Sequence, residues 1–391
     1  MTTDAAWLLT PQAIRAQCGA LFQLGLDDRL EHFTLDLDKL PACAAEVVTT
    51  IRANYPDLNV PPHARWRHFV LGGVDRWAPS ARALAEDPRE RARVECELAI
   101  LSVLLDAGAG AAWSYRDPAG GEVFARSEGL ALASLDMFAG GGFGDCSAAA
   151  LSGFTQEDLA KGFQVSAENP LEGLEGRAAL IRALGGIVAA RADVFGPTHR
   201  LGALADYLSD QANPDLPAER ILTTLLDVLG PIWPDRLQMD GRALGDCWPH
   251  PQAPGPGLVP FHKLSQWLSY SLIEPLGRAG VTVTDLDALT GLAEYRNGGL
   301  FLDAGVIALR HGDPGPISPQ STLVVEWRAL TVALLDQVAV HVRDLLGVSA
   351  QQMPLAAILE GGTWATGRRL AKAKRSGGGP PIEILSSGTV F

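Results

Sequence analysis

The stretch LVVEWRALTVALLDQVAVHVRDLL (Leu323–Leu346) has the apolar periodicity of a long helix. Its leucines, valines and alanines recur at three- and four-residue spacing, which is typical of a helix that buries much of its surface. The same periodicity predicts helices over Pro11–Leu24, Ala42–Ala53, Arg89–Leu105, Gly173–Val194, Ala218–Leu229, Phe261–Leu276 and Pro354–Lys374. The sequence therefore predicts a mainly α protein.

Strand signals are few by comparison. HFTLDL (His32–Leu37) and HFVLGG (His68–Gly73) predict short strands, and IEIL and GTVF around Ser386-Ser387-Gly388 predict a closing C-terminal hairpin. Thr155 with Asp158, and Thr284 with Asp287, have the spacing of capping boxes at helix starts. We expect a mainly α fold with small β elements (α+β).

Length and composition favour one compact globular domain over residues 1–391. The chain is 47% hydrophobic and 20% charged, and its Pro/Gly-rich stretches, Pro249–Gly257 and His311–Gln320, are too short to be free linkers. Within this domain we expect an N-terminal subdomain over residues 1–79 and a helical core over residues 80–391 that holds the site.

Charge and cysteine usage exclude several classes of protein. The formal net charge of -13 opposes nucleic-acid binding, and five scattered cysteines support neither a disulfide framework nor a zinc site. The longest apolar stretch, Leu98–Trp113, is too short to span a bilayer, and the N-terminus lacks the pattern of a signal peptide. We expect a soluble, cytoplasmic protein with no metal, nucleotide cofactor, nucleic-acid or membrane partner, and the oligomeric state stays open.

A cationic cluster near the C-terminus stands out on this acidic chain. EGGTWATGRRLAKAKRSGGGPPIEILSSGTVF (Glu360–Phe391) gathers Arg368, Arg369, Lys372, Lys374 and Arg375. The cluster suggests a small anionic ligand, because Gly361, Gly362 and Gly367 leave the nearby backbone open to close approach. The alternative is a solvated last helical turn whose cations complement the helix dipole.

EYRNGG is a second dense polar run, with Glu294, Tyr295, Arg296 and Asn297 in consecutive positions. It suits a helix end that meets a ligand, where Arg296 grips an anionic or ureido group and Asn297 reads an amide. A helix C-terminus capped by Asn-Gly is the alternative.

Aspartates inside apolar runs are candidates for acid/base chemistry, because burial without a partner raises a carboxyl pKa. Asp106 and Asp303 are the stronger candidates since glycines interrupt the chain beside them. Asp136 is a further candidate, whereas for Asp227 and Asp336 the solvent edge of a helix is the favoured explanation.

Two aromatic clusters complete the candidate residues. RWRHF places Arg65, Arg67 and His68 around a tryptophan, and AWSYRD places Trp113 and Tyr115 just beyond Asp106. Aromatic and guanidinium groups together can sandwich a planar ligand, although ordinary loop packing uses them too. Glu128 follows Ser127, for which helix capping is an adequate explanation.

The chain resembles the uracil-catabolism family known as Urc-four or Urg-three. The resemblance rests on RWRHF, AWSYRD, SEGLALASLDMFAGG, GFQVSAENPLEGLEGR, VPFHKLSQWLSYSLIEPL, GLAEYRNGGLFLDAGVI and the C-terminal motif, and it covers nearly the whole chain. FGDCSAAALSG (Phe143–Gly153) looks least typical of the family. EYR also resembles, more weakly, a motif of helical queuosine-salvage glycosidases, which favours a compact helical glycosidase-like domain.

The resemblance implies a step in pyrimidine degradation through ribosyl-urea species. We expect a hydrolase that cleaves the N-glycosidic bond of (phospho)ribosyl-urea, or a related ring-opened uridine derivative, into urea and a pentose (phosphate). Asp303 is the first choice for the catalytic carboxylate, with Glu294 and Asp106 as alternatives. The cationic cluster would hold a 5′-phosphate. The alternatives are a non-catalytic protein that sequesters a labile intermediate, and an amidohydrolase that acts on the ureido group. The hydrolase reading predicts that RWRHF, Asp106–Tyr115, EYRNGG and the C-terminal GRR line one pocket.

Overall fold

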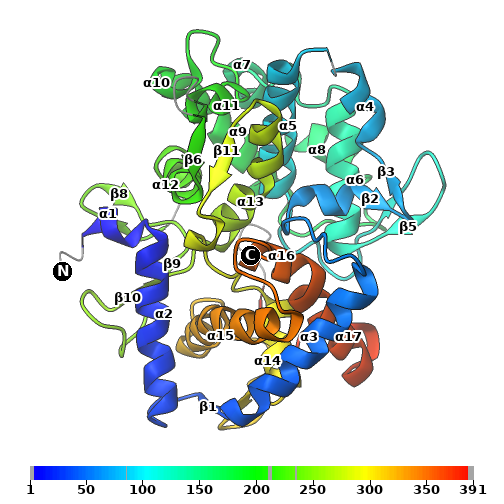
Figure 1. Cartoon of the computed structure of the whole chain (residues 1–391). Helices are drawn as coiled ribbons and strands as arrows, with labels where there is room; N and C mark the ends of the chain where they lie inside the picture. Colours follow the sequence, from blue (N-terminus) through cyan, green and yellow to red (C-terminus); the bar gives the residue numbers. More distant parts are fainter. Residues whose placement is uncertain (1–3, 85, 210–213, 234–235, 386–391) are drawn as a thin grey trace. The chain divides into compact units, whose positions relative to one another are not determined.

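The computed structural model describes residues 4–84, 86–209, 214–233 and 236–385 (Figure 1). In these ranges the protein is mainly α-helical, and its strands occur as two-stranded pairs. The predicted class, mainly α with small β elements, is confirmed. None of the helices in the described ranges has the length and hydropathy needed to cross a bilayer.

The chain divides into two compact units. Unit 1 takes Met1–His63, Arg236–Gln266 and Asp285–Leu385, and unit 2 takes Ala64–Asp235 and Trp267–Thr284. Helix α13 (Lys263–Arg278), which contains Pro275, begins in unit 1 and continues in unit 2. The expectations of a single domain, of an N-terminal subdomain over residues 1–79 and of a helical core over residues 80–391 stay predictions.

The elements of unit 1 come from three separate parts of the chain. Its helices are α1 (Ala5–Leu8), α2 (Pro11–Leu26), η1 (Leu37–Lys39), α3 (Leu40–Asn54), η4 (Leu286–Ala288), α14 (Tyr295–Asp303), α15 (Thr322–Leu346), α16 (Leu355–Ile358), the π-helical turn η5 (Leu359–Thr363), α17 (Trp364–Lys374) and η6 (Ser376–Gly378). Its strands are β1 (Phe33–Leu35), β7 (Gln238–Met239), β8 (Arg242–Ala243), β9 (Cys247–Pro249), β10 (Leu258–Pro260) and β12 (Ile307–Leu309).

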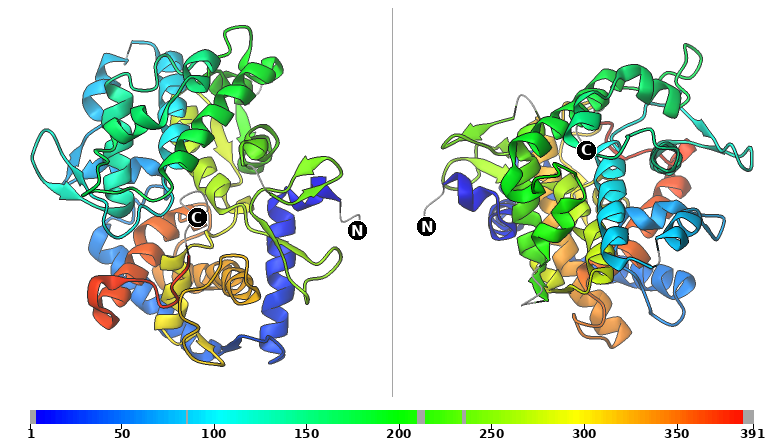
Figure 2. Two further views of the ribbon diagram at one scale, coloured as in Figure 1. Left: turned by 180° about the vertical axis from the view of Figure 1, so that it is seen from behind. Right: turned by 90° about the horizontal axis from the view of Figure 1, so that it is seen from above.

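Helix α15 is the centre of unit 1. It contacts α2, α3, α14 and α16, and α14 in turn packs on α17 (Figures 1 and 2). Ser321 caps its start by accepting the N–H of Val324, and Gly347 ends it in the left-handed conformation that glycine adopts without strain. Strand β1 pairs antiparallel with β12, so the chain after α2 lies beside the chain after α14.

Unit 2 is built mostly from one continuous stretch. Its helices are η2 (Arg65–Phe69), α4 (Ala78–Ala83), α5 (Pro88–Leu104), α6 (Arg126–Ala139), α7 (Ala148–Ser152), α8 (Gln156–Gly162), α9 (Leu174–Ala190), α10 (Ala192–Phe195), α11 (Ala203–Leu208), α12 (Ala218–Leu229) and η3 (Gly230–Ile232). Its strands are β2 (Val70–Leu71), β3 (Val74–Asp75), β4 (Tyr115–Arg116), β5 (Val123–Phe124), β6 (Asp215–Pro217) and β11 (Thr282–Thr284).

Helices α5 and α9 organise the packing of unit 2. Helix α5 contacts α6, α9, α11 and η2, while α9 contacts α7, α8 and α10 (Figure 2). The second half of α5 is buried on every side, including Glu95 and Glu97. Such carboxylates need partners, and Glu95 accepts hydrogen bonds from the side chains of Trp77, Arg91 and Arg278.

Of the predicted capping boxes and C-terminal strands, some are confirmed and others are not. Thr155 and Asp158 form the predicted capping box of α8, whereas Thr284 and Asp287 do not, because Asp287 instead binds Arg343 and the N–H of Leu355. IEIL enters a parallel bridge, Ile384 with Ile317, rather than a regular strand. GTVF, the second arm of the predicted hairpin, lies outside the described residues.

Candidate functional site

The EYRNGG run forms the first turn of α14, and Glu294 caps its N-terminus. The Glu294 carboxylate accepts the backbone N–H groups of Arg296 at 2.7 Å and Asn297 at 2.6 Å. A helix start leaves these donors without intrahelical acceptors, and such a cap contributes about 1 kcal/mol. The alternative of a helix C-terminus capped by Asn-Gly is therefore wrong.

Glycines let α14 and its neighbours approach closely. A Cβ on Gly298 would lie 2.8 Å from a tryptophan ring of α15, and a Cβ on Gly367 of α17 would clash with the carbonyl oxygen of Arg296. Gly361 and Gly362 are buried in η5 against aliphatic side chains. We expected the glycines of the C-terminal motif to leave the backbone open to a ligand, but they make room for other parts of unit 1.

Glu294 combines partial exposure with a raised pKa. Burial among protein atoms is the largest cause of the rise, while the two N–H bonds and the charges of Lys263 and His63 oppose it. A carboxyl group in this setting keeps its proton to a higher pH than an ordinary glutamate, yet part of its surface remains accessible. It has the properties expected of an acid/base group.

A histidine and a second glutamate accompany Glu294. His63 Nδ1 lies 2.6 Å from Glu360 Oε2, and both side chains are largely buried. The centroids of the His63 and Trp364 rings are 6.1 Å apart, and the Arg368 guanidinium lies 5.4 Å from the Trp364 ring centroid. We call these five residues of unit 1, Glu294, His63, Glu360, Trp364 and Arg368, the Glu294 cluster.

Asn297 and Arg296 are held by groups of unit 1. The fully buried Asn297 accepts a hydrogen bond from Thr363 Oγ1 at 2.9 Å and donates to a backbone carbonyl ahead of α14 at 3.2 Å. Arg296 donates Nη1 to the carbonyl of Gly378 at 2.9 Å and lies 4.8 Å from the ring centroid of the exposed Tyr295. Arg296 Nε has no hydrogen-bond partner among the described residues. Both side chains thus brace α14 in this structure.

Asp303, the first choice from the sequence, ends α14 in an ion pair. Arg375 donates Nη1 and Nη2 to its two carboxylate oxygens at 2.8 and 2.6 Å, and Lys374 Nζ donates to its backbone carbonyl at 2.6 Å. The Asp303 side chain is only 4% exposed. This pair fastens the segment after α17 to α14, and a catalytic role for Asp303 stays a prediction.

The predicted phosphate-binding cations are partly committed to protein groups. Lys374 and Arg375 hold Asp303, and the half-exposed Arg369 pairs with Glu46 of α3. Arg368 is the cation of this motif that belongs to the Glu294 cluster. Lys372 is exposed in the last turn of α17 and is not part of that cluster, so the phosphate prediction depends mainly on Arg368.

The predicted residues of unit 2 centre on a buried ion pair. Arg65, with no exposed side-chain surface, donates Nη1 to Asp106 at 2.7 Å and Nε to Ser102 Oγ at 2.6 Å. Its guanidinium lies 5.5 Å from the ring centroid of Trp267, and its Nη2 has no hydrogen-bond partner among the described residues. Burial lowers the pKa of Arg65, while the charges of Asp106 and Glu128 oppose the shift.

The remaining predicted residues of unit 2 have local partners. They are Arg67 with Glu274, His68 with the Trp267 ring, Trp113 with the Phe163 carbonyl, and Tyr115 with Asp136. Burial raises the pKa of both Tyr115 and Asp136. The candidate residues fall into one group in each unit, and the single pocket expected from the sequence stays a prediction.

Sequence reasoning missed His63, Glu360 and Thr363. His63 stands two residues before RWRHF, and Glu360 and Thr363 lie in the C-terminal motif, where attention went to the cations. The signal available was the position of Glu360 and Thr363 inside a family motif and of His63 close to another. In the described residues, no three His, Cys, Asp or Glu side chains gather so as to hold a metal ion.

Comparisons with known proteins agree on a family. Residues 7–391 match a family model described as "Protein of unknown function (DUF1688)". The chain is 39% identical over 407 residues to "Protein urg3" of Schizosaccharomyces pombe, with all of both chains covered. It is 35% identical over 416 residues to "Uracil catabolism protein 4" of Lachancea kluyveri, with 93% of each chain covered. The chain therefore belongs to the DUF1688 family, and the family resemblance inferred from its motifs is confirmed.

Proposed function

We propose that this protein acts in uracil catabolism as a hydrolase of the N-glycosidic bond in ribosyl-urea or a related ring-opened uridine derivative. The pathway follows from its similarity to a full-length relative named for uracil catabolism. The observation that carries the reaction is Glu294, a partly exposed carboxyl group with a raised pKa at the start of α14.

Glu294 suits the two proton transfers that the reaction needs. As the C1′–N bond breaks, the protonated carboxyl gives its proton to the departing urea nitrogen, and the carboxylate left behind stabilises the positively charged ribosyl centre. Water then adds to C1′ and returns a proton to Glu294. One water is consumed, and urea and the pentose are released.

The other residues of the Glu294 cluster bind the substrate and hold it in position. Glu360 orients the His63 imidazole through their short hydrogen bond, and the Trp364 ring gives the planar urea group or the sugar a flat surface. Arg368 supplies positive charge beside that ring, which suits a phosphate or a sugar hydroxyl.

The test is urea release by the wild-type protein from synthetic ribosyl-urea and from its 5′-phosphate, with intact uridine as the control substrate. We expect urea from at least one ring-opened substrate and no uracil from uridine. If the wild-type protein releases no urea from either substrate, the hydrolase proposal is wrong, and tight binding of ribosyl-urea without turnover would favour the sequestering alternative.

Substitutions of two neighbouring arginines test whether the protein recognises the 5′-phosphate. Arg368→Ala should raise KM for the 5′-phosphate by roughly tenfold or more, the loss expected for a charge-assisted hydrogen bond. Arg369→Ala removes the same charge one residue away but only breaks the surface pair with Glu46, so KM should stay within about twofold. Equal effects of the two variants would argue against phosphate binding at Arg368.

A further inference from the structure

A cavity in unit 2 includes no residue of the Glu294 cluster. Its volume is about 480 Å³, and it is lined by Val94, Glu97, Phe138, Gly144, Asp145, Cys146, Ser147, Thr198 and Arg200. Cavities of this size bind small molecules. The walls come from helix α5, the end of α6, and the two loops that follow α6 and α10.

The loop after α6 has a shape fixed by its backbone. Gly144 and Cys146 both adopt positive φ, at 61° and 56°, and a Cβ on Gly144 would lie 2.9 Å from Ala150. Ser147 forms an antiparallel bridge with Arg200, which joins this loop to the loop after α10. A β-carbon-bearing residue at positive φ costs roughly 1 kcal/mol or more, so the rest of the loop must stabilise this conformation.

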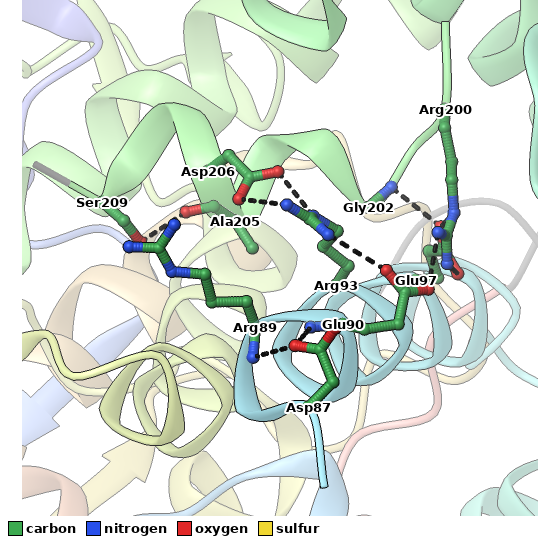
Figure 3. A network of polar contacts seen from close by, with 10 residues as sticks. All are labelled: Asp87, Arg89, Glu90, Arg93, Glu97, Arg200, Gly202, Ala205, Asp206 and Ser209. Carbon is green, nitrogen blue, oxygen red and sulfur yellow. Dashed lines mark hydrogen bonds and ion pairs between the residues drawn. The ribbon is translucent and has the colours of Figure 1, made fainter. Parts of the chain in front are cut away.

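The charges around the cavity are held in place by a network. Glu97, with a side chain 3% exposed, accepts Arg200 Nε at 2.7 Å, Arg200 Nη2 at 3.1 Å and the Gly202 N–H at 3.0 Å (Figure 3). Arg200 also donates to Glu90 at 2.6 Å. Because Arg200 is paired with Glu97 and with Glu90, which also accepts a hydrogen bond from Arg93, this guanidinium offers little attraction to an anion.

The remaining charge of the lining is negative. Asp145 is exposed, and hydrogen bonds from Ser147 lower the pKa of its carboxyl group, so it is ionised at neutral pH. Glu97 and Asp145 together outnumber Arg200 among the charged side chains that line the cavity. Thr198 and Ser147 add hydroxyl groups, and Phe138 adds an aromatic ring, which attracts cations through its face.

We propose that this cavity is a second binding site, for a small planar organic cation with N–H donors, of the amidinium or guanidinium class. Asp145 is the charged partner of the cation, the hydroxyls of Ser147 and Thr198 accept its N–H groups, and Phe138 lies against its apolar part. The site does not use the Glu294 cluster, and it stands or falls independently of the hydrolase proposal.

The probes are benzamidine, benzamide and benzoate, which share one shape and differ in charge. Isothermal titration of the full-length protein should show benzamidine binding most tightly and benzoate least. Asp145→Asn should weaken benzamidine by roughly fivefold, the usual worth of an exposed ion pair. Thr198→Phe, at an exposed position, should abolish binding by filling the cavity.

The matched control is Asp158→Asn, which removes another exposed aspartate whose carboxylate caps a helix of the same unit. It should leave benzamidine binding unchanged. The proposal is overturned if none of the three probes binds, if benzoate binds as tightly as benzamidine, or if Asp145→Asn and Asp158→Asn weaken binding equally.

Discussion

The two ends of helix α14 each carry a carboxylate, and the protein treats them in opposite ways. At the C-terminal end, Asp303 has both oxygens on the Arg375 guanidinium. At the N-terminal end, Glu294 accepts two backbone N–H groups, and burial raises its pKa although the charges of Lys263 and His63 oppose the rise. A carboxylate next to a cation is stabilised in its charged form, whereas one that is desolvated without such a partner is ready to exchange a proton. Partner chemistry, rather than burial alone, separates a structural acid from a reactive one.

The largest expected effect comes from replacing Glu294, the carboxylate at the N-terminal end of α14. Glu294→Gln should lower kcat for urea release by roughly 10²- to 10⁴-fold, the usual worth of a general acid/base group. The amide oxygen can still accept one of the two N–H groups at the start of α14, so the fold should persist and the circular dichroism spectrum should be unchanged. Asp303→Asn is the control and should keep kcat within tenfold; a larger loss there than in Glu294→Gln would return the catalytic role to Asp303.

The pH dependence of kcat distinguishes Glu294 from Asp303 as the group that titrates during the reaction. If Glu294 is the proton donor, as proposed, kcat should fall about tenfold per pH unit as the pH rises above its raised pKa. The same raised pKa means that the proton stabilises the folded state, a contribution present below the unfolded pKa and lost as pH rises through the folded pKa. Kinetics across pH in Asp303→Asn should show the same limb. A limb that vanishes in this variant would contradict the assignment.

A smaller effect, on the free energy of unfolding, is expected from the close packing of α17 against the N-terminal end of α14. Gly367→Ala would push a methyl group into the carbonyl oxygen of Arg296, at a cost of about 1–3 kcal/mol in the free energy of unfolding. Gly19→Ala in helix α2 meets no atom within 4 Å and should stabilise by up to about 1 kcal/mol. Urea denaturation measures both, and equal shifts would show that the contact at Gly367 relaxes freely.

The smallest change in the free energy of unfolding is expected from Asp303 at the C-terminal end of α14. Asp303→Asn leaves Arg375 without its charged partner and should cost about 1–2 kcal/mol, since Arg375 is only partly exposed. The control Asp336→Asn breaks a more exposed pair with Arg15 and should cost about 0.5 kcal/mol. If the two substitutions destabilise equally, the Asp303 pair has no special structural role.

Helices with continuous periodicity were predictable, and helix starts and breaks were less so. Ala218–Leu229 matches α12, and Leu323–Leu346 differs from α15 by one residue. Pro354–Lys374, predicted as one helix, contains the π-helical turn η5, where Gly362 packs against α3 and Gly361 packs against the segment that follows α3. Periodicity reports which side chains are apolar, but the break depends on how closely another helix approaches.

The motifs that meet in unit 1 were visible in the sequence, but the contacts of their side chains were not. EYRNGG and the C-terminal motif lie together in unit 1, because α14 packs on α17. The partner of Asp303 lies 72 positions further along the chain, and the partner of His63 lies 297 positions further. Local sequence contains no information about such pairs, so an acid that is buried and paired resembles one that is buried and reactive.

The interleaving of the two units has a consequence for synthesis of the protein. Helices α2 and α3 belong to the first 63 residues, yet the helix that covers their apolar faces, α15, begins only at Thr322. During translation these two helices cannot pack on α15 until more than half of the chain has been made. Their contact with α15 closes a long loop, which costs entropy and makes folding slow. Unit 2, which is nearly continuous, can form first, so a chain that stops before α15 presents an unfinished unit 1 to chaperones and proteases.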